Sequence, residues 1–248
     1  MNEESAYTVT RRGDTPIAEF TIARPGRANA LSHEVLDGLI ATLRRLPAGC
    51  DALLIAGSAA VFSAGADLGC VAGKCGDSRA VQSLIDELIE TIETAPYPVA
   101  ALYDGPCVGA AVEISLACDV RLATARGSLR IPATEIGTIY RPEGLENLSR
   151  RLPPLALQSM LLMGNRIPAR LAQSWGLLEV FDDADSAIDE LIDTVARINR
   201  KPGTFAGQKA SLRTLLHTQQ LPEQARLVIA GIRNASKECN NDRVKVGS

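Results

Sequence analysis

The chain has 248 residues, of which 46% are hydrophobic and 22% charged, and its formal net charge at pH 7 is −3. This length can form one sizeable core with a buried pocket, and the acidic balance is untypical of proteins that bind nucleic acid or an anionic membrane surface. No apolar run reaches the roughly 20 residues of a membrane-spanning helix, and the first five residues are polar and acidic. We therefore expect a cytoplasmic protein with neither a membrane segment nor a signal peptide.

The first part of the chain predicts strands that alternate with helices. Apolar segments bounded by turn residues indicate strands over residues 7–12, 17–23, 52–56, 99–103 and 120–123. Apolar residues at helical spacing indicate helices that begin after Ser32, which is a typical N-cap, and over residues 81–92 and 109–117. This alternation favours an α/β fold with a largely parallel sheet covered by helices.

Helices predominate from about residue 153 onward. The patterns predict helices over residues 155–163, 187–198, 204–216 and 222–232, with one strand near residues 178–181. These helices either cap the sheet domain or form an interface between subunits.

The six cysteines are scattered along the chain and are expected to act as small hydrophobic residues in a reducing compartment. Cys70 and Cys75 have four residues between them, but a zinc site would need two further ligands nearby. The only histidines are His33, which we place on the surface of an amphipathic helix, and His217. We therefore predict no metal site.

Two loops follow predicted buried strands and consist largely of small residues: residues 62–68 and residues 105–111. Small side chains let a ligand approach the main-chain N–H groups closely, and the second loop also begins a helix, whose first N–H groups are unpaired. Two such loops after neighbouring parallel strands can direct two donors at one oxygen atom. This geometry stabilises an enolate or a tetrahedral oxyanion.

Glu113 lies three residues after Ala110, so one helical turn places its carboxylate on the side of that N–H group. Its neighbours are apolar, and burial raises the pKa of a carboxyl group toward the range of a general acid or base. The alternatives are that the loops only allow tight packing of helix on sheet, and that Glu113 is a buried ion-pair partner of Arg121 or Arg130.

Several short segments occur in a characteristic order and spacing between about residues 7 and 235. They are Arg-Pro-Gly-Arg-Ala-Asn-Ala-Leu at 24–31, Phe-Ser-Ala-Gly-Ala-Asp-Leu at 62–68, Pro-Val-Ala-Ala at 98–101 with Gly105, Gly-Ala-Ala-Val-Glu at 109–113, Ala-Cys-Asp at 117–119, and the helix-to-strand step at 169–178. Together they resemble the crotonase (enoyl-CoA hydratase/isomerase) superfamily.

The resemblance implies an acyl-CoA substrate whose thioester carbonyl lies between two backbone N–H groups, here those of Ala66 and Ala110. It implies a spiral of ββα units over residues 1–190, which holds the acyl-CoA site. Residues 191–248 would be a helical region for capping and for assembly into a homotrimer or a dimer of trimers. No cofactor beyond the CoA moiety of the substrate is implied. The residues expected along the CoA and pantetheine path are Arg27, Ala28, Ala30, Ala64, Gly65, Asp67, Leu68 and Gly109.

The chain departs from the family pattern at two positions. The second oxyanion donor is usually glycine but is Ala110 here, whose N–H group is retained while its methyl group narrows the approach. Hydratases of the family typically carry a second glutamate directly after the proline that corresponds to Pro132, where this chain has Ala133. Glu135 could replace that glutamate only if the backbone shifted.

Three further side chains are candidates by position in the family. Tyr140 lines the acyl pocket of some relatives, either as a hydroxyl that bonds the substrate or as an aromatic wall. Arg141 would meet an acidic acyl group or solvent. Lys209 falls in a helix that contacts CoA phosphates in relatives.

We therefore predict an acyl-CoA hydratase or double-bond isomerase, with Glu113 as the proton shuttle and isomerisation favoured by the single carboxylate. The alternatives are decarboxylation of a carboxyacyl-CoA, carbon–carbon cleavage or thioester hydrolysis on the same scaffold. A third reading is a catalytically weak protein that binds acyl-CoA.

Overall fold

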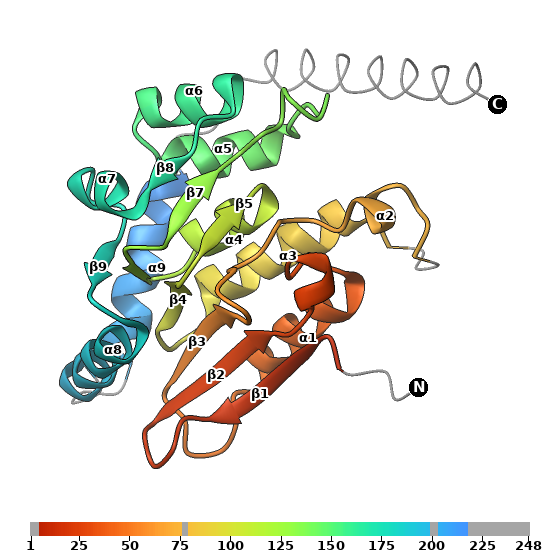
Figure 1. Cartoon of the computed structure of the whole chain (residues 1–248). Coiled ribbons are helices and arrows are strands. Elements are labelled where there is room, and N and C mark those ends of the chain that lie inside the picture. The colour runs from red at the N-terminus through yellow and green to blue at the C-terminus, as the bar shows by residue number, and fades with distance from the viewer. Residues whose placement is uncertain (1–4, 76–78, 199–202, 218–248) are drawn as a thin grey trace, which may run out of the picture.

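A computed structural model describes residues 5–75, 79–198 and 203–217 of the chain (Figure 1). A six-stranded sheet in the order β1-β2-β3-β4-β6-β9 forms its centre. Only β1 and β2 are antiparallel, and every later neighbour in this sheet is parallel. The strands are β1 (Tyr7–Arg11), β2 (Ile17–Ile22), β3 (Ala52–Gly57), β4 (Val99–Tyr103), β6 (Val120–Thr124) and β9 (Glu179–Phe181).

The two central strands consist of unbroken apolar runs because both of their faces are covered. All five residues of β4 are buried, as are the first five of β3. Helices α1 (His33–Arg44) and α3 (Val81–Thr94) pack side by side against one face of the sheet, and α8 (Ala184–Ile198) packs against the other. The side chain of Ser32 accepts a hydrogen bond from the N–H group of Val35, so the predicted N-cap of α1 is confirmed.

A smaller sheet begins where the large sheet ends. It contains β5 (Pro106–Val108), β7 (Ser128–Arg130) and β8 (Ile167–Pro168), in that order. Two isolated parallel bridges, Leu31 with Ala66 and Ser63 with Cys107, extend this layer across the earlier parts of the chain. The chain thus repeats one pattern, in which a long strand is followed by a short strand or bridge and then by a helix.

Seven further helices lie in the described part of the chain. They are the 3-10 helix η1 (Pro25–Arg27), α2 (Leu68–Val71), α4 (Ala110–Leu116), α5 (Pro142–Arg151), α6 (Pro154–Met163), α7 (Ala169–Ser174) and α9 (Thr204–His217).

The predicted parallel sheet, its strands and its long helices are confirmed, with bounds that differ by a few residues. The short elements β5, β7, β8, η1 and α2 were missed because two to four residues carry almost no periodicity, and the helix α5 was missed because it is largely polar. The predicted boundary at residue 190 falls inside α8, whose buried residues pack against the sheet. The predicted helix over residues 222–232 lies outside the described residues.

Two expectations about single side chains are wrong. Cys70 and Cys75 form a disulfide, because the turn after α2 reverses the chain and brings the two sulfur atoms together. Among the described cysteines, Cys50, Cys107 and Cys118 are free. His33 is buried rather than on the surface, because the loop that precedes α3 covers the start of α1.

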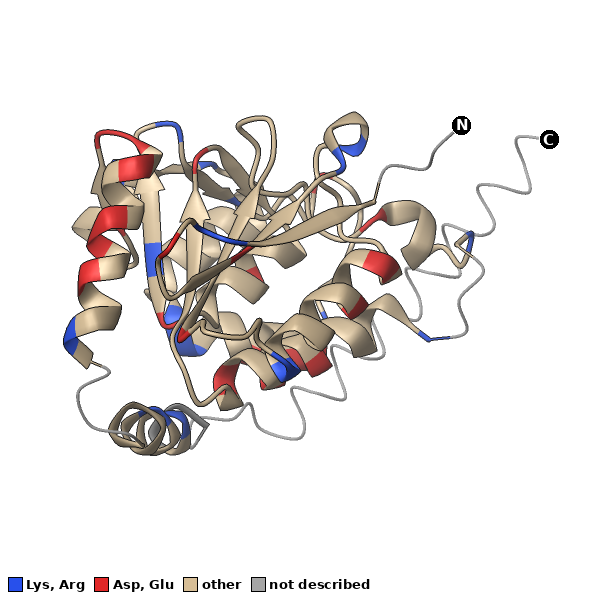
Figure 2. Cartoon of the chain, turned by 90° about the horizontal axis from the view of Figure 1, so that it is seen from below, with Lys and Arg blue, Asp and Glu red and all other residues tan. Residues whose placement is uncertain are grey.

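Within the described residues, no helix is both long and apolar enough to cross a bilayer. Acidic and basic segments both occur over the molecule, and acidic residues form a run along α8 (Figure 2). The cytoplasmic location stays a prediction.

Candidate active site

The two small-residue loops lie directly against each other. The N–H group of Phe62 donates to the carbonyl of Pro106 at 3.0 Å, and that of Val108 donates to the carbonyl of Ser63 at 2.9 Å. These bonds continue the parallel pairing of β3 with β4 into the smaller sheet. Parallel strands therefore deliver both loops to one place.

Gly65 allows the closest approach between the loops. A Cβ atom at Gly65 would lie 2.6 Å from the carbonyl oxygen of Val108 and 3.1 Å from the amide nitrogen of Ala110. The backbone at Gly65 has φ of +87°, a conformation that L side chains rarely adopt. Contact and conformation both require glycine here.

The N–H groups of Ala66 and Ala110 are both available to a ligand. Around Ala66, the carbonyl of Gly65 and the N–H group of Asp67 bond Leu31, a strand-like pairing that leaves the N–H group of Ala66 pointing away. Ala110 is the first residue of α4, where an N–H group has no partner within the helix. Among the described residues, no protein acceptor is found for either amide.

A cavity of about 250 Å³ opens beside these amides. Its lining is mostly apolar and comes from α2, α3, the start of α4 and the segment that precedes α5. The predicted site residues in its lining are Ala64, Ala66, Leu68, Gly109, Ala110, Glu113 and Tyr140. The predicted residues outside the lining are Arg27, Ala28, Ala30, Gly65 and Asp67.

Those five residues lie next to residues of the lining rather than in it. Arg27 and Ala28 are exposed at the end of η1, and the N–H group of Ala64 donates to the carbonyl of Ala28 at 2.9 Å. Asp67 caps α2 through the N–H group of Gly69 and forms an ion pair with Arg24 at 2.9 Å. Partial burial acts to raise the pKa of Asp67, but Arg24 and the N–H groups of α2 hold that pKa below its usual range.

Glu113 faces the cavity from the first turn of α4 and is 1% exposed. Arg141 donates two hydrogen bonds to its carboxylate, at 2.7 Å to Oε1 and 3.1 Å to Oε2, and the amide of Asn147 lies 3.4 Å from Oε1. Arg141 also bonds Asp86, so one guanidinium is shared by two carboxylates. Burial raises the pKa of Glu113, while Arg141 opposes this shift and the charge of Asp86 adds to it.

The ion-pair partner of Glu113 is therefore Arg141. The prediction of Arg121 or Arg130 as its partner is wrong. Arg121 donates to the carbonyls of Cys118 and Leu177, and Arg130 pairs with Glu135 at 2.7 Å. Arg141 also lines the cavity, where its buried guanidinium is paired with the carboxylates of Glu113 and Asp86; its contact with an acidic acyl group stays a prediction.

Sequence reasoning missed this cluster because its members come from three helices. Asp86 lies on α3, Asn147 on α5, and Arg141 is the N-cap of α5. A Cβ atom at Gly144 would lie 3.0 Å from both the Glu113 carboxylate and the Arg141 guanidinium. The one available signal was a glycine in the first turn of a helix, where it leaves room for the ion pair.

The position of the missing second glutamate is also part of the cavity. Ala133 lines it and is 4% exposed. Glu135 bonds Arg130, is exposed and does not line the cavity, so it does not replace that glutamate. Tyr140 lines the cavity and is half-buried; burial and the charge of Glu113 raise the pKa of its hydroxyl.

Lys209 does not project toward the cavity. Its ammonium group is buried on α9 and forms an ion pair with Asp119 at 2.7 Å. Lys209 is therefore already neutralised within its own chain.

Comparison with known proteins agrees with this architecture. A model of the enoyl-CoA hydratase/isomerase family matches residues 12–247. A probable enoyl-CoA hydratase of Bacillus subtilis (strain 168) is 28% identical over 214 residues, which cover 84% of this chain and 81% of the relative. An enoyl-CoA hydratase/carnithine racemase from Magnetospirillum magneticum has 26% identity and a TM-score of 0.75, with 91% of this chain and 86% of that structure covered.

A second solved structure supports the fold alone. A methylmalonyl-CoA decarboxylase in complex with 2-nitronate-propionyl-CoA has a TM-score of 0.82 at 21% identity, with 94% of this chain and 90% of that structure covered. The repeated strand–strand–helix pattern, the paired loops and the match over residues 12–247 lead to one assignment. This chain belongs to the enoyl-CoA hydratase/isomerase family and has the crotonase fold.

Proposed function

We propose that this chain moves the double bond of an enoyl-CoA through a thioester enolate, with Glu113 as its proton carrier. The observation that carries the proposal is the cavity lining, in which Glu113 is the one carboxylate among the described residues and lies beside two available amides. Isomerisation needs one base that returns the proton it removed, whereas hydration needs two groups to handle one water molecule.

The proposed reaction has two steps. The N–H groups of Ala66 and Ala110 bind the thioester oxygen of a 3-enoyl-CoA, and the Glu113 carboxylate removes a proton from carbon 2. The electron pair of that C–H bond forms a dienolate whose negative charge lies on the bound oxygen. Glu113 then gives the same proton to carbon 4, and the double bond lies between carbons 2 and 3.

Arg141 serves this reaction as a positioning residue. Its two hydrogen bonds fix the orientation of the Glu113 carboxylate and keep an ionised form available in an apolar pocket. Because Asp86 shares the same guanidinium, Glu113 is only partly neutralised and keeps the basicity that proton removal requires.

The CoA moiety is proposed to lie beside the cavity, along the segment that contains Arg27 and Ala28. Arg27 and Ala28 are exposed there, and the N–H group of Ala64 donates to the carbonyl of Ala28, which places this exposed segment beside the first loop. This path ends at Ala66, where the thioester would be held.

The test uses the full chain with 3-hexenoyl-CoA, followed by the absorbance of the conjugated 2-enoyl thioester, and with crotonyl-CoA to measure hydration. Glu113→Gln should lower kcat for isomerisation by about 10²- to 10⁴-fold, because it removes the proton carrier and keeps the shape. Glu135→Gln, a carboxylate outside the cavity, is the matched control and should leave kcat unchanged. Full activity of Glu113→Gln would remove Glu113 from the mechanism.

The same experiment separates the alternatives. Hydration that is faster than isomerisation would make the chain a hydratase. Turnover in a panel of carboxyacyl-CoA substrates would favour decarboxylation, cleavage or hydrolysis; Arg141 lines the cavity but is already paired with two carboxylates of the chain. If the chain binds acyl-CoA tightly but shows neither turnover nor exchange of carbon-2 protons for deuterium, it is a binding protein.

We also propose that copies of this chain assemble into a trimer or a dimer of trimers. Helix α6 exposes large apolar side chains, with Leu155 at 73%, Leu162 at 53% and Met163 at 67% exposure. Such a group on one helix is typical of a protein–protein contact. Light scattering on the purified chain tests this, and a monomer at micromolar concentration would contradict it.

A further inference from the structure

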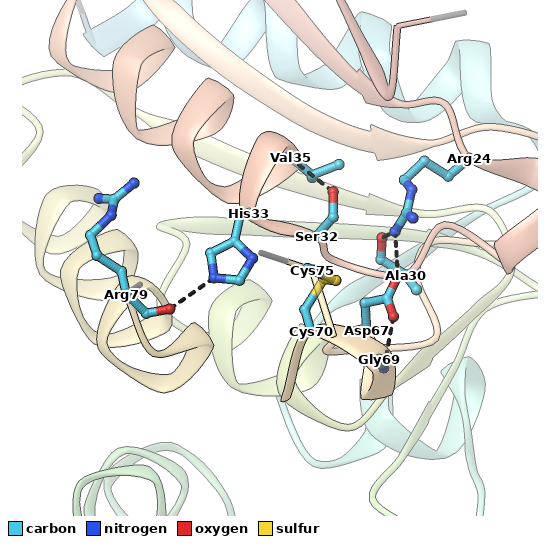
Figure 3. The surroundings of a disulfide bond; sticks show 10 residues. All are labelled: Arg24, Ala30, Ser32, His33, Val35, Asp67, Gly69, Cys70, Cys75 and Arg79. Atoms are coloured by element: carbon cyan, nitrogen blue, oxygen red, sulfur yellow. Dashed lines mark hydrogen bonds and ion pairs between the residues drawn. A yellow bond between two sulfur atoms is a disulfide. The ribbon is translucent and has the colours of Figure 1, made fainter. Parts of the chain in front are cut away.

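Three potential metal ligands meet at the start of α1, beside the disulfide. His33 begins α1, Cys70 lies on α2 and Cys75 lies in the turn that follows it. One ligand atom from each lies within 4.8 Å of the other two (Figure 3). His33 and Cys70 are buried and Cys75 is exposed, so the group is open to solvent on one side.

The hydrogen bonding of His33 leaves one ring nitrogen free to bind a ligand. Nε2 lies 2.9 Å from the carbonyl oxygen of Arg79, and a carbonyl only accepts, so Nε2 carries the hydrogen. Nδ1 therefore has a lone pair; it is buried and has no partner among the described residues. This nitrogen is on the side of the ring that faces the sulfur atoms (Figure 3).

We propose that the reduced form of this cluster binds a thiophilic divalent cation, such as Zn²⁺, through Nδ1 of His33 and the thiolates of Cys70 and Cys75. Zn–S bonds of about 2.3 Å and Zn–N bonds of about 2.0 Å at tetrahedral angles place such ligand atoms roughly 3.5–3.8 Å apart. The observed cluster is within small side-chain rotations of this geometry. Water fills the fourth position from the exposed side.

A disulfide alone does not explain why Nδ1 of His33 is buried without a hydrogen-bond partner. A buried acceptor without a hydrogen-bond partner is destabilising, and a metal ion bound at Nδ1 removes that cost. Histidines that ligate metals usually donate their other N–H group to a carbonyl or carboxylate, as Nε2 does to Arg79. These features match a ligand that is held in place for a metal.

The metal and the disulfide exclude each other. A phosphine reductant and one water molecule convert the disulfide into two thiols and a phosphine oxide, and Zn²⁺ then displaces two thiol protons. In the reverse direction, hydrogen peroxide and two protons take two electrons from the zinc-bound thiolates. The products are the disulfide, free Zn²⁺ and two water molecules.

The cluster is adjacent to the proposed acyl site. Leu68 and Val71 of α2 line the cavity, and Cys70 lies between them in the same helix. Either the disulfide or the metal links Cys70 of α2 to Cys75, so both states restrain the helix that carries Leu68 and Val71.

The test begins with the full chain, reduced by a phosphine and freed of it under anaerobic conditions. Titration with Co²⁺ should give a thiolate-to-cobalt charge-transfer band that saturates at one equivalent, and Zn²⁺ should displace the cobalt. The oxidised chain should show no such band. Equal binding by both forms, or none by the reduced form, would overturn the proposal.

Matched variants assign the ligands. Cys70→Ser and Cys75→Ser should each abolish the charge-transfer band or weaken Zn²⁺ binding at least about 10- to 100-fold. Loss of a residue that only hydrogen-bonds a metal ligand already costs this much, and loss of the ligand itself costs at least as much. His33→Gln keeps an N–H group for Arg79 and removes Nδ1, and should weaken binding similarly. Cys50→Ser, at a free cysteine outside the cluster, is the control that should bind normally. Circular dichroism verifies that each variant is folded, and undiminished binding by His33→Gln would overturn the three-ligand site.

Discussion

Replacing Gly65 by alanine should separate the two loops that form the proposed oxyanion site. The new Cβ atom would lie 2.6 Å from the carbonyl oxygen of Val108, whereas ordinary contact begins at 3.4 Å. The loops must therefore move apart by about 0.8 Å. The new methyl group would also lie 3.1 Å from the amide nitrogen of Ala110, one of the two proposed donors.

The expected effect on catalysis is large. A misplacement of about 1 Å at a reacting group costs on the order of 10²-fold in rate, and loss of one oxyanion donor costs about 10²- to 10³-fold. We therefore expect kcat for 3-hexenoyl-CoA isomerisation to fall by roughly 10²-fold or more in Gly65→Ala. The positive φ adds a stability cost of about 1–2 kcal/mol, which lowers Tm by roughly 2–8 °C.

Gly176→Ala is the matched control. Gly176 has φ of +71° and nothing within 4 Å of the position of its Cβ, so alanine there meets the backbone strain without the clash. Steady-state kinetics, deuterium exchange at carbon 2 and thermal unfolding are measured on both variants. The reasoning is refuted if Gly65→Ala keeps kcat within threefold of the unsubstituted chain, or if Gly176→Ala loses as much activity.

Three further predictions concern the buried ion pair and the missing glutamate. Because burial raises the pKa of Glu113 and Asp86 adds to this shift, activity should be lost on the acid side at a pH above the usual range of a glutamate. Asp86→Asn should move this limb of the kcat/KM profile to lower pH, and Glu87→Gln on the same helix should not; a shift to higher pH would contradict the assignment. Arg141→Met should leave Glu113 buried without its partner and cost about 3–5 kcal/mol, a fall in Tm of roughly 6–20 °C that calorimetry would detect. A fall no larger than in Glu113→Gln/Arg141→Met would mean that the pair is not coupled. Ala133→Glu restores a second carboxylate to the cavity and should raise hydration of crotonyl-CoA relative to isomerisation; an unchanged ratio would show that a missing carboxylate does not select the reaction.

Local patterns were enough to predict the frame of this protein. The apolar runs of β3 and β4 and the helical spacing in α1 and α3 identify a covered parallel sheet, because each pattern lies within a few consecutive residues. The two small-residue loops and Glu113 were found for the same reason. A parallel sheet also brings the ends of its neighbouring strands together, so the adjacency of the loops followed from the topology.

The charged residues around Glu113 could not be predicted from local patterns. Arg141 lies 28 residues after Glu113 and reaches it only because α5 packs against α4, while Asp86 arrives on α3. Several arginines were plausible partners by sequence, and the choice among them depended on packing. The burial of Arg141 between the two carboxylates is likewise a property of the assembled helices.

The cluster of His33, Cys70 and Cys75 illustrates the same limit. The spacing of the two cysteines was visible, but their third neighbour, His33, lies 37 residues before Cys70 on another helix. By itself, the sequence determined the parallel sheet, the paired loops and the family, because these depend on short-range patterns and on strand order. Only the tertiary structure decided which charges and ligands meet, because side-chain contacts between separate helices depend on how those helices pack.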